Sequence, residues 1–180
     1  MDIRTTVEKA FERWKGSSPE VITRLPQSGS DRVYFRLICR EDQVIGAYNP
    51  SREENEAFVG FSNHFRSKGL PVPEIYVYYP EEKVYFLEDL GDINLFTWLA
   101  RRSVEERFNE ETGNLFLTIA GDLVRIQNEG IRGLDLSLCY PHRSFDRQSI
   151  VWDMNYYKYM FLKLIGAPFN ETRLERDFEI

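Results

Sequence analysis

The stretch Val84-Tyr-Phe-Leu-Glu-Asp-Leu-Gly-Asp92 separates two parts of the chain that differ in their hydrophobic pattern. Before it, short apolar runs bounded by turn residues predict β-strands, whereas after it apolar residues recur at helical intervals. The stretch itself has the pattern of a strand that ends in two acids and a glycine. We therefore expect an α+β protein, with residues 1–90 as one domain and 91–180 as the other.

The part before this stretch predicts an antiparallel sheet with two helices. Apolar residues at helical spacing place a helix over residues 5–14. Strands are expected over residues 20–25, 33–39, 43–48, 74–79 and 83–88, with turn residues between them. Between the third and fourth strands, Ser51 is followed three residues later by Glu54, the spacing of a capping box. A helix should therefore begin at Ser51, and Gly69 should end it.

The part after the stretch predicts an incomplete helical domain. Helices are expected over residues 103–129 and 146–165, and a further helix should begin at Asn170. Ser103 and Glu106 repeat the capping-box spacing at the start of the first. The last helix has only begun its apolar stripe where the sequence stops, so we expect a truncated helical lobe. Uncovered apolar surface on such a lobe favours self-association.

Composition and charge exclude several classes of protein. The 180 residues are 42% hydrophobic and 29% charged, which is ordinary for a globular chain. A net charge of −6 without a basic run argues against nucleic acid or an anionic membrane as a partner. No apolar run approaches the roughly 18 residues of a membrane span. With no secretory signal, and with Cys39 and Cys139 expected as free thiols, we expect a cytoplasmic protein.

The turn Gln27-Ser-Gly-Ser-Asp-Arg32 between the first two strands has the residues of a phosphate-binding loop. Gly29 can adopt conformations that turn backbone N–H groups toward an anion, and Ser28 and Ser30 add hydroxyl donors. Arg32 can bind two oxygens at once. The same residues also make an ordinary hairpin turn, so the residues alone leave both roles open.

The end of the fifth strand has the features of a purine-binding edge. Where the chain leaves the sheet, backbone groups of Glu88 and Leu90 would lack sheet partners and could bind an adenine edge. Phe86 and Leu87 would supply an apolar wall. A charged turn at a domain boundary explains the same residues, and this alternative stays open.

These two segments, in this order, resemble the aminoglycoside phosphotransferase/choline kinase family. The resemblance is closest to its bacterial sugar kinases, which phosphorylate N-acetylmuramate and N-acetylglucosamine. The matching stretches are residues 28–36, 53–58, 69–75, 87–92 and 145–153, of which Leu87-Glu-Asp-Leu-Gly-Asp92 is the most specific. The order of three strands, a helix and two strands is that of the small, nucleotide-holding lobe of a protein-kinase-like fold.

The resemblance implies ATP-dependent phosphoryl transfer to a small hydroxylated substrate, with ATP and Mg²⁺ as cofactors. It places the ATP phosphates on residues 28–32 and adenine on Glu88, Asp89 and Leu90. Glu54 would be the acid that the family carries on the helix after the third strand, and a helix cap is its alternative role.

The side chains of the helix near residue 150 indicate a substrate region, because aromatic planes and charged hydrogen-bonding groups recognise sugar rings. Asp146, Arg147 and Asp153, with Trp152 nearby, would bind the hydroxylated substrate. The alternative is that Asp146 caps the helix and Trp152 packs.

The sequence departs from the family in three ways. The third strand lacks the Lys that holds phosphates in kinases, and Arg32 or Arg36 would have to supply that charge. No His-x-Asp-x-x-x-x-Asn loop is present, because Ser144 stands where an Asp should follow His142. We expect this loop and the Mg²⁺ ligands beyond Ile180, so no catalytic residue is assigned and the chain should not turn over.

Two other functions remain open. One is a choline or other amino-alcohol kinase on the same scaffold. The other is a non-catalytic nucleotide-binding or interaction module, which would use the same turn and strand end without transferring a phosphoryl group.

Overall fold

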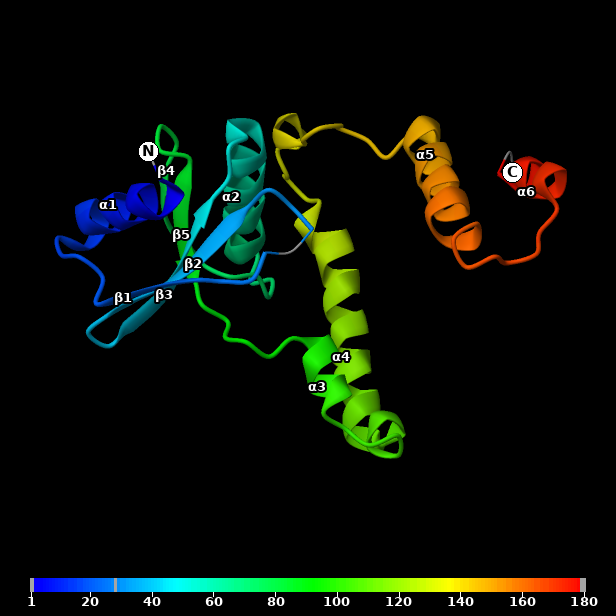
Figure 1. Cartoon of the computed structure of the whole chain (residues 1–180), viewed down its shortest axis with the longest axis horizontal. Coiled ribbons are helices and arrows are strands. Elements are labelled where there is room, and N and C mark those ends of the chain that lie inside the picture. The colour runs from blue at the N-terminus through cyan, green and yellow to red at the C-terminus, as the bar shows by residue number, and fades with distance from the viewer. Residues whose placement is uncertain (1, 28, 179–180) are drawn as a thin grey trace. The chain divides into compact units, whose positions relative to one another are not determined.

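The short apolar runs of the first part form a five-stranded antiparallel sheet in the computed structural model, which describes residues 2–27 and 29–178 (Figure 1). The strands are β1 (Val21–Arg24), β2 (Val33–Cys39), β3 (Asp42–Tyr48), β4 (Ile75–Tyr79) and β5 (Val84–Glu88). Their order is β1-β2-β3-β5-β4, and every neighbouring pair is antiparallel. The predicted α+β class is confirmed, and each strand lies within one residue of its expected bounds.

The sheet carries one helix on each face, α1 (Ile3–Lys15) and α2 (Arg52–Ser67) (Figure 1). Alternation along β2 buries Val33, Phe35 and Leu37 in the core that α1 shares, while the intervening side chains turn to the face of α2. The buried core on the α2 face consists of Ile45, Ala47, Tyr85 and Leu87, with Phe58 and Val59 of α2 packed against it.

Gly46 of β3 allows α1 to approach the sheet closely. A Cβ atom at this position would lie 2.8 Å from side-chain atoms of both Val7 and Leu37. Because real Cβ contacts are longer than this, a larger residue would push α1 away from the strand. The glycine therefore fixes the distance between α1 and β3.

The helices of the second part are α3 (Leu95–Ala100), α4 (Glu110–Arg125), α5 (Arg147–Tyr157) and α6 (Glu171–Asp177). Short 3-10 turns lie at Glu106–Phe108 and Leu136–Leu138, and π-helical turns extend α4 over Ile126–Gly130 and α5 over Lys158–Leu162. The predicted caps Asp146 and Asn170 are confirmed at α5 and α6. The α3 helix was not among the predicted elements.

The single helix predicted over residues 103–129 is wrong at its start. Ser103 and Glu106 do form both hydrogen bonds of a capping box, but the turn that they cap ends at Phe108. Asn109 then adopts an extended conformation and accepts a hydrogen bond from the N–H of Thr112, which starts α4. Competition from this second capping residue divides the helix.

By its contacts the chain forms two compact units, Met1–Tyr140 and Pro141–Ile180. In the first unit, the segment after α4 is attached to α2. His64 Nε2 lies 2.8 Å from the carbonyl oxygen of Gly130, and Leu138 packs on Gly60, where a Cβ atom would come within 2.5 Å of it. The domain boundary expected at residue 90 stays a prediction.

Two expectations from the composition can be compared with the structure. Across the described residues, no helix combines the length and the apolar character that crossing a bilayer demands. Cys39 and Cys139 are both free, as predicted. The absence of a nucleic-acid partner, the cytoplasmic location and self-association stay predictions.

Candidate functional site

A cavity of about 250 Å³ lies between the sheet and the junction that follows β5. Its lining residues are Leu25, Tyr34, Arg36, Ile45 and Pro73, together with residues 87–92. Tyr34, Ile45 and Leu87 belong to the hydrophobic cluster on the α2 face of the sheet. The cavity therefore has apolar walls from the strands and a polar edge from the junction, and all three residues predicted to hold adenine line it.

Leu90 supplies the free backbone groups of this polar edge. Within the described residues, neither its N–H nor its C=O forms a hydrogen bond, and the side chain is 69% exposed. The N–H of Glu88, which we predicted to be free, is not, because it donates to the carbonyl of Glu74 at 2.9 Å. One donor and one acceptor on Leu90 are thus available to a ligand.

Arg36 is bound to the junction by two carboxylates. Its Nε lies 2.5 Å from Asp89 Oδ2 and its Nη2 lies 3.0 Å from Asp89 Oδ1, while Nη1 donates to Asp92 at 3.1 Å. Asp89 also accepts hydrogen bonds from Gln43 Nε2 at 2.7 Å and from the N–H of Gly91 at 2.9 Å. We call these five residues the Asp89 clasp.

The charges of the clasp stabilise one another. Burial raises the pKa of Asp89, but hydrogen bonds from Arg36, the Gly91 amide and Gln43 outweigh it and hold that pKa below its usual value. Hydrogen bonds to Asp89 and Asp92 raise the pKa of Arg36. The Asp89 side chain is only 4% exposed, so its negative charge is kept inside the protein by these donors.

Arg32 lies four residues before Arg36, which is roughly 13 Å of extended chain. Its Nη2 lies 2.9 Å from Glu54 Oε1, and its guanidinium stands 4.8 Å from the centre of the Phe58 ring. The Nε of Arg32 is buried and has no hydrogen-bond partner among the described residues. Arg32 therefore has one carboxylate partner and an unused donor, unlike Arg36.

Glu54 contacts both Ser51 and Arg32, and the role that the family resemblance gives it stays a prediction. Its N–H donates to Ser51 Oγ at 3.1 Å, which confirms Ser51 as the cap of α2. The return bond of a capping box is not made, because the N–H of Ser51 donates to Asn49 Oδ1 at 3.2 Å. The carboxylate of Glu54 is thereby left to bind Arg32.

The predicted phosphate turn lies between β1 and β2. Ser28 falls outside the described residues. A Cβ atom on Gly29 would meet no atom within 4 Å, and the carbonyl of Ser30 accepts a 3.4 Å hydrogen bond from the amide of Gln27. Neither Gly29 nor Ser30 belongs to the residues that line the cavity, so their contact with phosphates stays a prediction.

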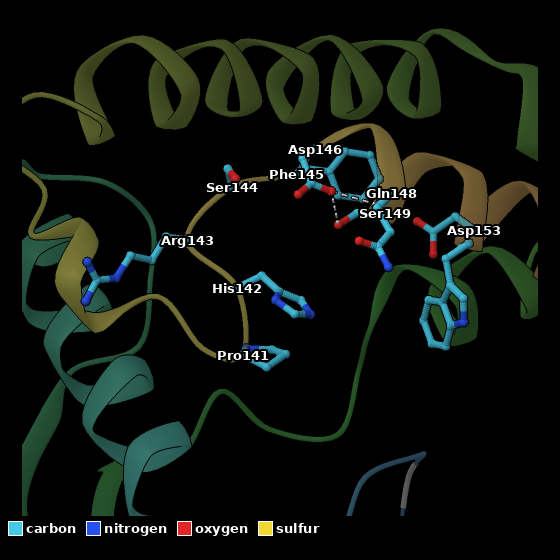
Figure 2. Close-up of a pocket in the computed structure, with 10 residues that line it drawn as sticks. Pro141, His142, Arg143, Ser144, Phe145, Asp146, Gln148, Ser149 and Asp153 are labelled. Carbon is cyan, nitrogen blue, oxygen red and sulfur yellow. Dashed lines mark hydrogen bonds between the residues drawn. The ribbon is translucent and has the colours of Figure 1, made fainter. Parts of the chain in front are cut away.

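A second hollow, of about 680 Å³, lies within the unit Pro141–Ile180 (Figure 2). The loop before α5 and its first turns line it with residues 141–146, Gln148, Ser149, Trp152 and Asp153. In Figure 2, the side chains of His142 on the loop and Gln148 on the helix extend into the space between loop and helix, whereas Arg143 points away from it. Of the predicted substrate residues, Asp146 and Asp153 line this hollow and Arg147 does not.

The polar groups of this hollow differ in their availability. Asp146 is occupied as the cap of α5, since it accepts from the N–H and the hydroxyl of Ser149 at 2.9 and 3.1 Å. Trp152 contacts the ring of Tyr156, with ring centres 6.5 Å apart, yet it remains 71% exposed, so most of its ring is open to solvent. Ring and carboxylate thus face solvent together at Trp152 and Asp153.

The residues described contain no group of three or more His, Cys, Asp or Glu side chains that could hold a metal ion. Comparison with models of known protein families and with curated protein sequences finds no match to this chain. The family resemblance and the roles that it implies stay predictions.

Six lining residues of the cavity were missed by sequence reasoning. Tyr34 and Ile45 could have been found, because strand alternation and pairing place them on the same sheet face as Arg36. Leu25, Pro73, Gly91 and Asp92 lie in connections, whose position depends on the folded sheet. No local pattern identifies such residues.

Proposed function

We propose that this chain provides the nucleotide-binding part of an ATP-dependent phosphotransferase, with a small hydroxylated molecule, first of all an amino sugar, as acceptor. The observation that supports it most is the cavity beside the unpaired Leu90 backbone. Its 250 Å³ lies slightly below the roughly 300 Å³ at which pockets for drug-sized ligands begin. This size suits one planar base rather than a complete nucleotide.

Adenine would be held by apolar walls and by one backbone residue. Leu25, Ile45 and Leu87 supply the walls, and burying a ring against them stabilises it by about 25 cal/mol per Å². The N–H and C=O of Leu90 match a base edge that carries both an acceptor nitrogen and an amino group. Each such hydrogen bond contributes about 0.5–1.5 kcal/mol.

Arg32 is better suited than Arg36 to bind the phosphates of ATP. The guanidinium of Arg36 is bonded to both Asp89 and Asp92, whereas Arg32 has only Glu54 as a carboxylate partner. Glu54 would hold the guanidinium of Arg32 in place. ATP supplies the phosphoryl group to be transferred; the residues of this chain bind and orient it.

The hollow beside α5 supports a hydroxylated acceptor. The exposed ring of Trp152 can cover an apolar sugar face, and Gln148 and Asp153 can bind hydroxyl groups. The same ring with Asp153 would also suit the quaternary ammonium of choline, through cation–π attraction. Titrating the full chain with N-acetylglucosamine and with choline shows which of the two acceptor classes binds. Repeating each titration with Trp152→Ala shows whether that binding depends on the Trp152 ring.

Thermal unfolding of the full chain with ATP, ADP and adenosine, with and without Mg²⁺, tests the nucleotide site. A ligand at 100 times its Kd stabilises the native state by about 2.7 kcal/mol, so the Tm should rise with nucleotide concentration. Leu25→Trp fills the cavity and should abolish the rise. Val21→Trp, at an exposed position of β1, should keep it. A wild-type Tm that no nucleotide raises would contradict the proposal.

The ratio of ADP to adenosine affinity tests the role of Arg32. A hydrogen bond to a charged group contributes about 1.5–3 kcal/mol, so Arg32→Met should lower this ratio roughly tenfold or more. Arg36→Met serves as the matched variant and should change the affinities for both ligands alike. An unchanged ratio in Arg32→Met would exclude this residue as the phosphate ligand.

A non-catalytic module stays the alternative outside enzymes. It would bind nucleotide with the same residues, yet a full-length protein containing this chain would transfer no phosphoryl group to any acceptor. A cytoplasmic location is part of the proposal, because ATP and free thiols are both typical of that compartment.

A further inference from the structure

The geometry points to Asp89 as a positioning residue that keeps the backbone of Leu90 open to the cavity. The buried carboxylate joins β2, β3 and the junction through the Asp89 clasp. The part of this inference that concerns ligand binding rests on the proposed function, whereas the part that concerns the conformation of the junction does not.

The junction has little else to hold it. Residues 89–94 belong to no helix or strand, and their exposed side chains include Leu90, Asp92 and Ile93. Gly91 has a φ of 81°, a conformation that glycine adopts readily and that gives the chain a sharp turn. A segment with few buried contacts opens locally at low free-energy cost unless specific bonds restrain it. Those bonds converge on Asp89.

The two oxygens of Asp89 are fully used. Oδ1 accepts from Arg36 Nη2 and from the N–H of Gly91, and Oδ2 accepts from Arg36 Nε and Gln43 Nε2. A carboxylate has about four lone-pair sites, so none remains for a metal ion or a substrate proton. The role of Asp89 is therefore to hold other groups in place.

The bond from Gly91 to Asp89 decides which backbone groups remain free. An aspartate that accepts from the residue two positions on forms a local turn around the residue between them. That residue is Leu90, whose N–H and C=O have no partner among the described residues. Arg36 and Gln43 anchor this turn to the sheet, beside the apolar walls of the cavity.

Asp92 provides a matched comparison, because it binds the same guanidinium. Its Oδ1 lies 2.9 Å from Arg36 Nη2, but its side chain is 78% exposed, against 4% for Asp89. Exposed ion pairs stabilise little, whereas breaking a buried pair leaves a charge without compensation. Neutralising Asp89 should therefore loosen the junction, and neutralising Asp92 should not.

The test compares Asp89→Asn with Asp92→Asn in the full chain. Hydrogen exchange at the Gly91 amide should become at least about tenfold faster in Asp89→Asn, and change less than about twofold in Asp92→Asn. Amides of the β2–β3 pairing should keep their wild-type protection in both. ADP affinity should fall roughly tenfold in Asp89→Asn alone. Arg36→Lys keeps the positive charge but not the forked geometry of the guanidinium, so its Gly91 exchange rate and its ADP affinity should lie between those of wild type and Asp89→Asn.

Each outcome decides the inference. Wild-type exchange at Gly91 in Asp89→Asn overturns the clasp, and wild-type ADP affinity in that variant overturns the positioning role. Lost protection throughout the β2–β3 pairing would show that Asp89 has a merely structural role, and would also overturn the positioning role. If Asp89→Asn does not fold, exchange at Gly91 and ADP affinity are measured in Arg36→Lys instead. If wild type binds no nucleotide, the proposed function fails, and exchange at Gly91 alone decides the conformational part.

Discussion

Residues 3–88 and residues 95–177 bury their side chains in different ways. In the described part of the chain, every buried hydrophobic side chain lies between Val7 and Leu87, and most of them belong to the two clusters on the faces of the sheet. In the helical region, the buried side chains are those of Thr112 and Lys158. The sheet region thus has its own hydrophobic core, whereas the helices rest mainly on caps, ion pairs and local contacts.

The candidate nucleotide site obtains its rigidity from the sheet region. Most helical stability in proteins comes from packing an apolar face, and here those faces remain open. Examples are Phe96, Phe108, Leu117 and Leu164, each more than 70% exposed. Surfaces of this kind mark interaction sites, so self-association stays a prediction, to be tested by sedimentation. The cavity, in contrast, is built on the sheet that has a core.

The largest effect should come from removing a ring from the sheet core. Phe86 is fully buried, with ring centres of Phe11 and Trp14 at 5.7 and 5.2 Å. Phe86→Ala should lower the free energy of unfolding by about 3–5 kcal/mol. Phe108→Ala, in the helical region at 86% exposure, should change it by less than about 0.5 kcal/mol. Urea unfolding measures both, and similar losses would contradict the comparison.

Adding one methyl group should have opposite effects in the two regions. Gly46→Ala places a Cβ against Val7 and Leu37 and should destabilise by about 1–3 kcal/mol. Gly121→Ala lies in α4 with no atom within 4 Å, and should stabilise the helix by up to about 1 kcal/mol. Thermal unfolding of each variant shows whether its stability rises or falls. A loss of stability in both variants would mean that α4 is packed more tightly than its open surface indicates.

The same contrast explains how much the sequence could predict. Strands were placed to within one residue because turn residues and alternating burial mark them locally. The start of α4 was misplaced because Ser103 and Asn109 are both good caps, and only the folded chain selects between them.

For the candidate site, the sequence indicated the residues but not their pairing. Arg32 and Arg36 were equivalent candidates for one missing lysine. Their partners Glu54 and Asp89 lie 22 and 53 positions away along the chain, so only the folded sheet separates their roles. Long-range pairs of this kind leave no local pattern.

An acid-sensitive effect is expected at α6. Lys158 is buried and forms ion pairs with Glu175 and Glu171. Hydrogen bonds from Lys163 and Lys158 lower the pKa of Glu171 in the folded chain. The contribution of Glu171 to stability is therefore present above about pH 4.3, its pKa in the unfolded chain, and is lost as the pH falls further. Hydrogen bonds to Glu175 and Glu171 raise the pKa of Lys158, so its charge persists below pH 10 or so.

Amide signals of α6 followed from pH 6 to pH 3 test this local release. We expect α6 to lose protection below about pH 4.3 while the sheet amides keep theirs. Lys158→Met is the control variant, because without the ammonium group the acid dependence of α6 should disappear. Protection that is equal at both pH values in the wild type would show that contacts other than ion pairs hold α6.

The smallest effect concerns a buried hydroxyl in the sheet core. Tyr85 is fully buried, burial raises its pKa, and its hydroxyl has no hydrogen-bond partner among the described residues. Removing an unsatisfied polar group is neutral or slightly favourable, so Tyr85→Phe should change the free energy of unfolding by less than about 1 kcal/mol. A larger loss in urea unfolding would reveal a partner for this hydroxyl.

Mapping the amide signals of the full chain during titration with ADP tests the nucleotide site most directly. We expect ADP to cause saturable shifts at Leu25, Tyr34, Ile45 and residues 88–92, and to leave the signals of α5 and α6 unchanged. The corresponding titration with adenosine should shift the same cavity residues but leave the signals around Arg32 unchanged. An absence of saturable shifts, or shifts confined to residues 141–177, would contradict a nucleotide site on the sheet.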